Sequence, residues 1–204
     1  MNPTGNICII GESHAGLYDY FKPIYLDSTT MHRVGRDGVN SIIAAFGSRF
    51  PNPGDWLVFV VGEVDCRCHI DRQIKEAGRD ETEVITTLAT NYVKALAQYK
   101  KESNVFVGVR GVVPPLEHGN HQCDRFPIKG EYKDRLRYQQ ALNVELEKTC
   151  KENGVLFIPC PAWAIKEDGG MKMEISDGII HIANSHENRV LACQELVNTI
   201  QKSM

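Results

Sequence analysis

The residue types of a nucleophilic hydrolase stand in two short segments at opposite ends of the chain. Ser13 lies near the start in Gly11-Glu12-Ser13-His14, and Asp177 and His181 lie near the end in Asp177-Gly178-Ile179-Ile180-His181. A serine hydroxyl is a poor nucleophile until a histidine takes its proton, and that histidine needs an acid or a carbonyl group to fix its tautomer. We therefore predict that Ser13 is a nucleophile, that His181 is its base and that Asp177 orients the imidazole.

These side chains must be positioned by strands and helices that alternate along the chain. The sequence predicts strands, recognised as apolar and β-rich runs, at 6–11, 24–31 (weaker), 56–62, 105–113 and 155–160. Apolar residues at three- and four-residue spacings predict helices at 81–101, 132–153 and 186–202. Parallel neighbours need a crossover connection, so this alternation predicts a parallel sheet with helices on both faces.

The fold class that follows is α/β, a three-layer α/β/α arrangement around a flavodoxin-like five-stranded parallel sheet. At 204 residues the chain is within the range of one domain, which we expect to span 1–204. Ligands of such sheets bind at the carboxyl ends of the strands. Ser13 directly follows the first predicted strand, and the irregular segment 114–131 follows the fourth, so both should lie at that edge.

Charge and apolar run lengths narrow the classes of partner. The formal net charge is −3, with 23 basic and 26 acidic residues spread along the chain, which argues against nucleic acid or an anionic membrane. The longest apolar runs, such as 56–62, fall well short of the roughly 20 residues of a membrane span. We expect a small-molecule or carbohydrate substrate and, with no export signal at the N-terminus, a cytoplasmic location. The sequence gives no prediction of oligomeric state.

The cysteines allow two interpretations. Their number, seven, is odd, which favours free thiols in a reducing compartment. The alternative is a zinc site drawn from Cys66, Cys68, His69, His118, His121 and Cys123. Neither cysteine-containing pair has the C-x2-C spacing of structural zinc modules, so we favour packing or surface cysteines and predict neither a metal nor an organic cofactor.

Four short blocks give the chain a resemblance to the SGNH hydrolases, also called the GDSL-type lipases and esterases. Gly11-Glu12-Ser13 is similar to the block that holds the nucleophile, and Gly38 corresponds to a glycine that gives an oxyanion N–H group. Gly62-Glu63-Val64-Asp65 stands where the family has Gly-x-Asn-Asp, and Asp177 with His181 resembles the final Asp-x-x-His block. The blocks occur in order at predicted strand ends, so the resemblance covers essentially the whole chain.

The resemblance implies a serine esterase or deacetylase that works through an acyl-enzyme intermediate. The substrate it implies is an acyl ester, with an O-acetyl group on carbohydrate as one form. It also implies that the backbone N–H groups of Ser13 and Gly38 receive the oxyanion. Two other functions stay open: a glycan- or ligand-binding module that has lost efficient catalysis, and an O-acyltransferase that uses the same site.

The third block departs from the family pattern. Val64 replaces the asparagine whose side chain donates to the oxyanion, and losing one such donor typically costs on the order of 100- to 1,000-fold in rate. Arg67, in the same segment, could substitute as a charged donor; its alternative is a salt-bridged arginine. Asp65 is a candidate for the oxyanion or substrate region, although a structural role in holding loops is the simpler account.

The last block has one extra residue, which separates Asp177 and His181 by four positions rather than three. In a loop this spacing still permits a carboxylate-to-imidazole hydrogen bond, and a backbone carbonyl is the alternative orienting group. Each histidine and the serine also has a plainer interpretation: Ser13 as a helix N-cap, His14 as a partly exposed loop residue and His181 as a satisfied core residue.

Overall fold

The computed structural model describes residues 5–26, 29–44, 51–119 and 124–204. Its centre is a five-stranded sheet in which every pairing is parallel. The strands are β1 (Ile7–Gly11), β2 (Ile24–Tyr25), β3 (Trp56–Val60), β4 (Phe106–Arg110) and β5 (Leu156–Ile158). Their order, β2-β1-β3-β4-β5, is the flavodoxin-like order, so the predicted fold class is confirmed.

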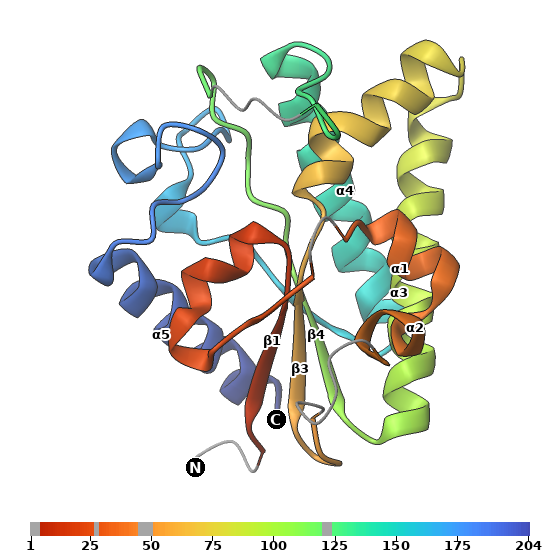
Figure 1. Cartoon of the computed structure of the whole chain (residues 1–204), viewed down its shortest axis with the longest axis vertical. Coiled ribbons are helices and arrows are strands. Elements are labelled where there is room, and N and C mark those ends of the chain that lie inside the picture. Colours follow the sequence, from red (N-terminus) through yellow and green to blue (C-terminus); the bar gives the residue numbers. More distant parts are fainter. Residues whose placement is uncertain (1–4, 27–28, 45–50, 120–123) are drawn as a thin grey trace.

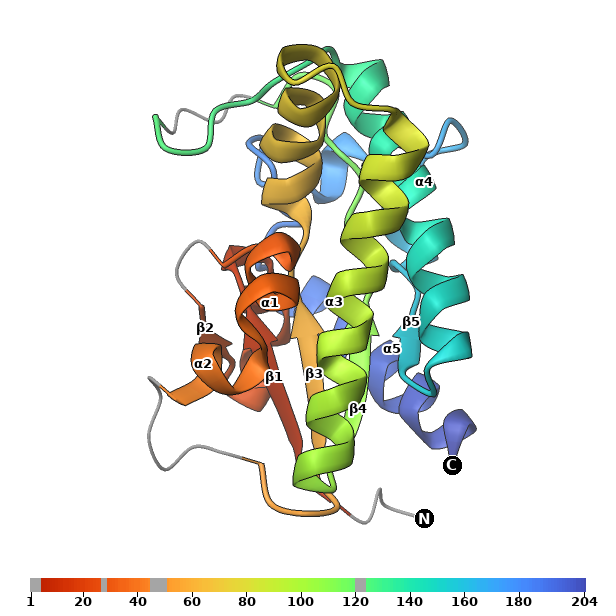
Figure 2. The same cartoon turned by 90° about the vertical axis from the view of Figure 1, so that its right-hand side faces the viewer.

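Helices cover both faces of this sheet (Figures 1 and 2). One face carries η1 (Ser13–Phe21) and α5 (His186–Ser203), and the other carries α1 (Met31–Asp37), α2 (Val39–Ile43), α3 (Glu81–Ser103) and α4 (Tyr132–Glu152). Short helical segments η5 (Ala162–Ala164) and η6 (Met173–Ile175) follow β5. The three long helices begin at the predicted residues. None of the helices in the described ranges has the length and apolar character needed to cross a membrane.

The core is split by the sheet into two apolar clusters. Leu57 and Phe59 of β3 point to the α1–α3–α4 face, and Trp56, Val58 and Val60 point to the η1–α5 face. All residues of β3 are buried, which explains why this strand reads as a continuous apolar run rather than an alternating one. β3 is therefore the central strand that fixes the position of its two neighbours, β1 and β4.

The second strand is much shorter than predicted. β2 covers only Ile24–Tyr25, and α1 begins within the segment that was expected to be extended. Thr30 fixes the start of that helix, because its side chain accepts a hydrogen bond from the N–H group of Arg33 at 3.1 Å. Residues 27 and 28 of the predicted strand lie outside the described ranges.

After β3 the chain forms a helical segment over 63–76 that the sequence analysis did not predict. Two π-helical stretches interrupt it, η3 (Asp65–His69) and η4 (Arg72–Glu76). The residues of this segment that pack on the core, Cys66, Ile70 and Ile74, are few, and none of the residues of η4 is buried, so the apolar pattern is too weak to predict a helix. π-helical turns are frequent at functional sites, and η3 carries two predicted site residues, Asp65 and Arg67.

Candidate active site

Ser13 lies at the carboxyl end of β1, where the chain turns into η1. The close approach of β1 to β3 requires a glycine just before it, since a Cβ atom at Gly11 would lie 2.1 Å from the carbonyl oxygen of Val60. The N-cap of η1 is Glu12, not Ser13, and it makes no side-chain capping bond. Ser13 is the first residue of η1, and its exposed side chain contacts His181 instead of capping the helix.

The structure brings the two ends of the chain together at this serine. Oγ of Ser13 lies 2.8 Å from Nε2 of His181, and Nδ1 of His181 lies 2.6 Å from Oδ2 of Asp177. Both distances are within the range of hydrogen bonds. The arrangement fixes the tautomer, because the carboxylate accepts a hydrogen bond from Nδ1–H and leaves the Nε2 lone pair facing the serine hydroxyl.

The loop before α5 explains how a four-residue spacing still gives this contact. Oδ1 of Asp177 accepts hydrogen bonds from the N–H groups of Ile179, Ile180 and His181 at 2.8, 3.1 and 3.0 Å. The N–H group of Asp177 in turn donates to the carbonyl oxygen of His181 at 3.0 Å. The aspartate thus closes the loop with one oxygen and contacts the imidazole with the other.

The surroundings lower the pKa of both His181 and Asp177. Burial lowers the pKa of His181, and the positive charge that His14 can carry lowers it further, while Asp177 opposes both effects. Burial alone would raise the pKa of Asp177, but hydrogen bonds from the His181 ring and from backbone N–H groups outweigh it and lower the pKa. At neutral pH the site therefore holds a carboxylate and a neutral imidazole.

His14 is buried, so its interpretation as a partly exposed loop residue is wrong. Its Nε2 atom lies 3.2 Å from the carbonyl oxygen of Ile180, and its ring centroid lies 4.6 Å from that of His181. Nδ1 lies 3.6 Å from Oε1 of Glu12. Burial lowers the pKa of His14, but the carboxylates of Glu12 and Glu63 outweigh this and raise it overall.

Two buried acids lie behind the serine. Oε1 of Glu12 accepts a hydrogen bond from the N–H group of Glu63 at 3.0 Å. Burial, together with repulsion from Glu12, raises the pKa of Glu63. No role was predicted for these acids. The sequence signal for them is that Glu12 directly follows the first predicted strand and Glu63 the third; the register, in which Gly11 pairs with Val60, brings them together.

Arg67 forms an ion pair with Glu63 and is not an oxyanion donor. Its Nε atom donates to Oε1 of Glu63 at 2.6 Å, and Nη1 donates to the carbonyl oxygen of Phe126. The guanidinium is buried between these partners and is not among the residues that line the cavity beside Ser13. The predicted role of Arg67 as a substitute donor is therefore wrong, and the salt-bridge alternative describes it.

Gly38 is also a wrong assignment. It ends α1 with φ of 77°, and its N–H group donates to the carbonyl oxygen of Val34 at 3.0 Å. That N–H group is used to close the helix and cannot also receive an oxyanion. The N–H group of Ser13 itself remains a candidate donor, because it belongs to the first turn of η1, where N–H groups have no intrahelical partner.

Val64 and Asp65 both have buried side chains. Oδ2 of Asp65 accepts a hydrogen bond from the N–H group of Met31 at 2.8 Å, which ties η3 to the start of α1. Burial raises the pKa of Asp65 to about 7. Asp65 is a structural link, as the simpler account predicted, rather than a neighbour of the serine. The buried apolar side chain of Val64 offers no donor.

Metal-ligand residue types cluster once within the described ranges. Glu12, His14 and Glu63 offer ligand atoms that lie within 4.8 Å of one another. Their contacts to Ile180, Arg67 and the Glu63 N–H group already use these side chains. The zinc alternative gathers no such cluster there: Cys66 and Cys68 are buried on η3, His118 is exposed, and His121 and Cys123 lie outside the described ranges.

The cavity beside Ser13 is small. It encloses about 20 Å³ and is lined by Ser13, His14, Leu17, Tyr18, Val60, Arg110, Val113, Pro161, His181, Ile182 and Asn184. Tyr18 and Val60 are buried and close its inner end. The space next to the hydroxyl therefore suits a group of one or two heavy atoms.

The sequence matches no model of a known protein family and no curated protein sequence. Solved structures do match over nearly the full chain. A candidate acylhydrolase from Bacteroides fragilis has a TM-score of 0.61 at 11% identity, covering 97% of this chain and 86% of that one. A GDSL-like lipase from Bacteroides thetaiotaomicron has 0.60 at 13%, covering 97% and 88%. An acetyl-xylooligosaccharide esterase from a Geobacillus species has 0.54 at 13%, covering 98% and 96%.

Proposed function

We propose that this chain, which has the fold of the SGNH hydrolases, is a serine esterase that removes short acyl groups. The observation that carries the proposal is the continuous contact from Oγ of Ser13 through the ring of His181 to Asp177, at 2.8 and 2.6 Å. A serine, a neutral imidazole and a carboxylate in this order are the parts of nucleophilic acyl transfer.

In the proposed reaction, Oγ of Ser13 attacks the ester carbonyl carbon while its proton passes to Nε2 of His181. The N–H group of Ser13 receives the negative charge that develops on the carbonyl oxygen. The imidazolium then gives its proton to the departing alcohol oxygen, which leaves an acyl group on Ser13. A water molecule repeats these steps with His181 as base, so that the carboxylic acid is released and Ser13 regains its proton.

The small cavity beside the serine supports an acetyl group as the acyl part. About 20 Å³ admits a methyl group, whereas a longer chain would displace the buried side chains of Tyr18 or Val60. The proposal of carbohydrate as the alcohol part rests on fold likeness to proteins named acetyl-xylooligosaccharide and acetylxylan esterases. The alcohol would occupy the open side of Ser13, which is exposed.

Hydrolysis of 4-nitrophenyl acetate, butyrate and octanoate tests both parts. We expect turnover of the acetate, falling at least tenfold for the butyrate and further for the octanoate. Ser13→Ala should abolish turnover while leaving the circular dichroism spectrum and melting temperature nearly unchanged, because Ser13 is exposed. Ser185→Ala, which removes the serine cap of α5, is the matched control and should keep turnover. Equal turnover by wild type and Ser13→Ala would remove the serine from the reaction.

A second candidate function, ligand binding without efficient hydrolysis, is favoured by the oxyanion region. Val64 is buried and apolar, and the Gly38 N–H group is occupied, so two of the three donors of the family pattern are missing. Labelling by a fluorophosphonate separates the two candidates. An activated Ser13 reacts with the probe, whereas a binding module leaves it unlabelled and binds acetylated xylo-oligosaccharide without releasing acetate. Acetyl transfer to an added sugar, rather than to water, would instead identify an O-acyltransferase.

A further inference from the structure

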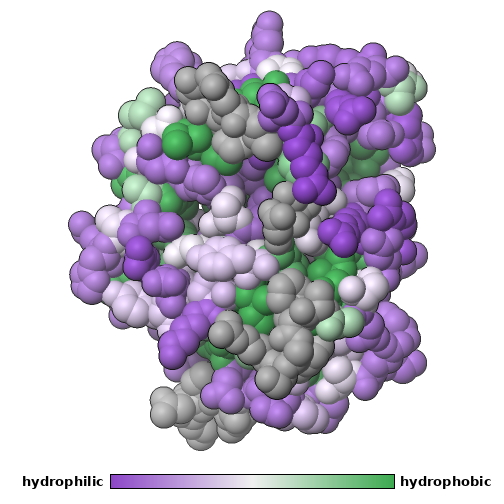
Figure 3. Space-filling view, viewed as in Figure 1, coloured by the Kyte–Doolittle hydropathy of each residue, from purple (hydrophilic) through white to green (hydrophobic). Residues whose placement is uncertain are grey.

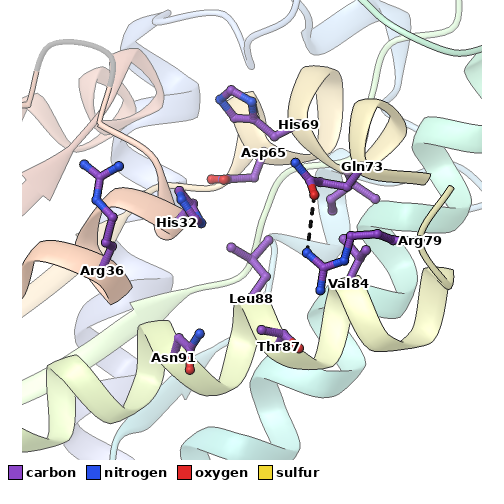
Figure 4. A pocket seen from close by; sticks show the side chains of 11 residues that line it. His32, Arg36, Asp65, His69, Gln73, Arg79, Val84, Thr87, Leu88 and Asn91 are labelled. Carbon is purple, nitrogen blue, oxygen red and sulfur yellow. Dashed lines mark hydrogen bonds between the residues drawn. The ribbon is translucent and has the colours of Figure 1, made fainter. Parts of the chain in front are cut away.

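A second pocket, larger than the cavity beside Ser13, lies on the α1–α3 side of the sheet. It encloses about 320 Å³ between α1, the segment carrying η3 and η4, and α3 (Figure 4). Ser13, His181 and Asp177 do not line it. Its volume falls within the range of small-molecule sites, roughly 300 to 1,000 Å³. The pocket is therefore large enough for a ligand of its own.

Basic side chains dominate one end of this pocket. His32 and Arg36 lie four residues apart on α1, and His69 lies above them on η3 (Figure 4). Asp37 holds the Arg36 guanidinium through two hydrogen bonds, at 2.6 and 2.9 Å, but does not line the pocket. Asp37 thus uses Nε and Nη2 of Arg36, and Nη1, with the neighbouring histidine rings, is left to donate to an anionic oxygen group.

The opposite end offers uncharged groups and a second arginine. Nη1 of Arg79 donates to Oε1 of Gln73 at 3.3 Å, and Nη2 donates to Glu83, outside the pocket, at 2.8 Å. Thr87 extends from α3 at this end beside Leu88, and Asn91, one turn further along α3, lies near α1 and the basic end (Figure 4). These hydroxyl and amide groups can exchange hydrogen bonds with hydroxyls, and the apolar surface of Leu88 between them suits the C–H face of a sugar ring.

Asp65 lies between the two ends and carries an unsatisfied oxygen. Oδ2 is bonded to the N–H group of Met31, whereas Oδ1 is buried and has no hydrogen-bond partner among the described residues. Figure 4 shows this carboxyl group at the wall of the pocket, beside His32. A buried polar atom without a partner is costly. Because Oδ1 has almost no surface open to the pocket, a ligand meets Asp65 as part of a closed wall and not as a hydrogen-bond partner.

We propose that this pocket binds a ligand of monosaccharide size that carries a phosphate or carboxylate group. The anionic group lies at the end formed by His32, Arg36 and His69. The ring rests on Leu88, and its hydroxyls face Thr87 and Asn91. This is a second site, independent of hydrolysis at Ser13.

Isothermal titration calorimetry with glucose 6-phosphate, glucuronate, glucose, inorganic phosphate and AMP tests the proposal on the full chain. We expect saturable binding of glucose 6-phosphate or glucuronate, at least tenfold tighter than glucose and inorganic phosphate. The two anionic probes distinguish a phosphate ligand from a carboxylate ligand. The proposal is overturned if both anionic sugars have a Kd above about 10 mM. It is also overturned if AMP binds more tightly than both.

Variants locate the binding. Arg36→Gln should weaken it at least tenfold, and Leu88→Trp, which fills the pocket, should abolish it. Arg33→Gln is the matched control: Arg33 also lies on α1 and contacts Asp37, at 3.7 Å, but does not line the pocket. The proposal is contradicted if Arg33→Gln weakens binding as much as Arg36→Gln does. It is also contradicted if a folded Leu88→Trp protein still binds, because the ligand then lies elsewhere.

A further pair of measurements keeps this proposal separate from the esterase. Ser13→Ala should bind the anionic sugar with unchanged affinity, and Arg36→Gln should hydrolyse 4-nitrophenyl acetate at the wild-type rate. Binding without any ester hydrolysis would support the pocket and contradict the proposed esterase. Ester hydrolysis without binding of either anionic sugar would do the reverse.

Discussion

Asp177 contacts His181 through both of its carboxylate oxygens, each in a different way. Oδ2 lies 2.6 Å from the ring atom Nδ1, and Oδ1 accepts the backbone N–H group of His181 at 3.0 Å. The first contact orients the imidazole, and the second fixes the backbone from which it extends. A single residue thereby sets both the position and the tautomer of the proposed base.

Asp177→Asn separates these two contacts. The amide oxygen can keep the backbone hydrogen bonds of Oδ1, but the amide nitrogen donates to Nδ1 and so places the ring proton on Nε2, facing Ser13. We expect kcat for 4-nitrophenyl acetate to fall by about 1,000- to 10,000-fold, with little change in melting temperature. Steady-state kinetics and thermal unfolding of the same preparation measure both quantities.

Asp177→Ala is the companion variant. It removes the loop hydrogen bonds as well, so it should lose stability by about 1 to 3 kcal/mol in addition to losing activity. A fully active Asp177→Asn would show that the carboxylate charge has no part in the reaction. The orienting role would then pass to a backbone carbonyl group, the alternative that the spacing left open.

The sheet and the long helices were predictable because their signals are local. The apolar run of β3, the repeated spacing in α3 and the serine cap of α5 each lie within one segment. The contact of Ser13 with His181 joins residues 168 positions apart. It followed only from the rule that parallel strands end at one edge, together with the resemblance to a family whose fold the structure confirms.

The remainder of the site was not predictable, for two physical reasons. Gly38 was assigned because it follows the predicted second strand, as the oxyanion glycine does in the family that the chain resembles, but the Thr30 cap starts a helix there and carries the glycine to its far end. Glu12 and Glu63 are charged residue types that are usually exposed, and only the pairing of β1 with β3 shows that they meet inside the protein. The position of Gly38 thus depends on a helix start within a segment that was predicted as a strand, and the meeting of the two acids depends on strands that are distant in sequence.

His14 should influence the pH dependence of hydrolysis. The proposed base acts only when neutral, and its pKa is lowered by burial and then by the charge of His14. His14→Gln can keep the hydrogen bond to the Ile180 carbonyl oxygen but removes that charge, so the pKa of His181 should rise. The acid limb of kcat/KM should move to higher pH, with less than a tenfold loss at the plateau.

A pH profile of kcat/KM between pH 4.5 and 8.5 measures this shift. His186→Gln is the control, because His186 is exposed and contacts Tyr20 on the outer side of η1. Its profile should coincide with that of the wild type. An unmoved acid limb in His14→Gln would mean that His14 is uncharged in the working pH range and acts through packing alone.

Arg67 and Arg72 form ion pairs of the same spacing in very different surroundings. Arg67 is buried with Glu63, whereas Arg72 is exposed and lies 3.3 Å from Glu76. Arg67→Ala leaves a buried acid and the Phe126 carbonyl oxygen without their donor, which should cost about 3 to 5 kcal/mol of unfolding free energy. Arg72→Ala should cost no more than about 1 kcal/mol. Urea unfolding compares the two, and equal losses would contradict the buried network.

Asp65 should make the protein less stable as the pH rises. Burial raises the pKa of its carboxyl group to about 7 in the folded protein, above the ordinary value of 3.8. Between these values the folded state binds more protons than the unfolded state, so the free energy of unfolding falls with increasing pH, and the full cost is present above pH 7. Asp65→Asn cannot ionise and can still accept the hydrogen bond from Met31. Relative to wild type, it should therefore gain on the order of 2 kcal/mol between pH 5 and pH 8.

Urea unfolding of both proteins at the two pH values measures this difference, in which any pH-independent effect of the amide cancels. If the stability difference between Asp65→Asn and wild type stays constant between pH 5 and pH 8, Asp65 has the same pKa in the folded and unfolded chains. If this difference falls instead, folding stabilises the ionised form of Asp65.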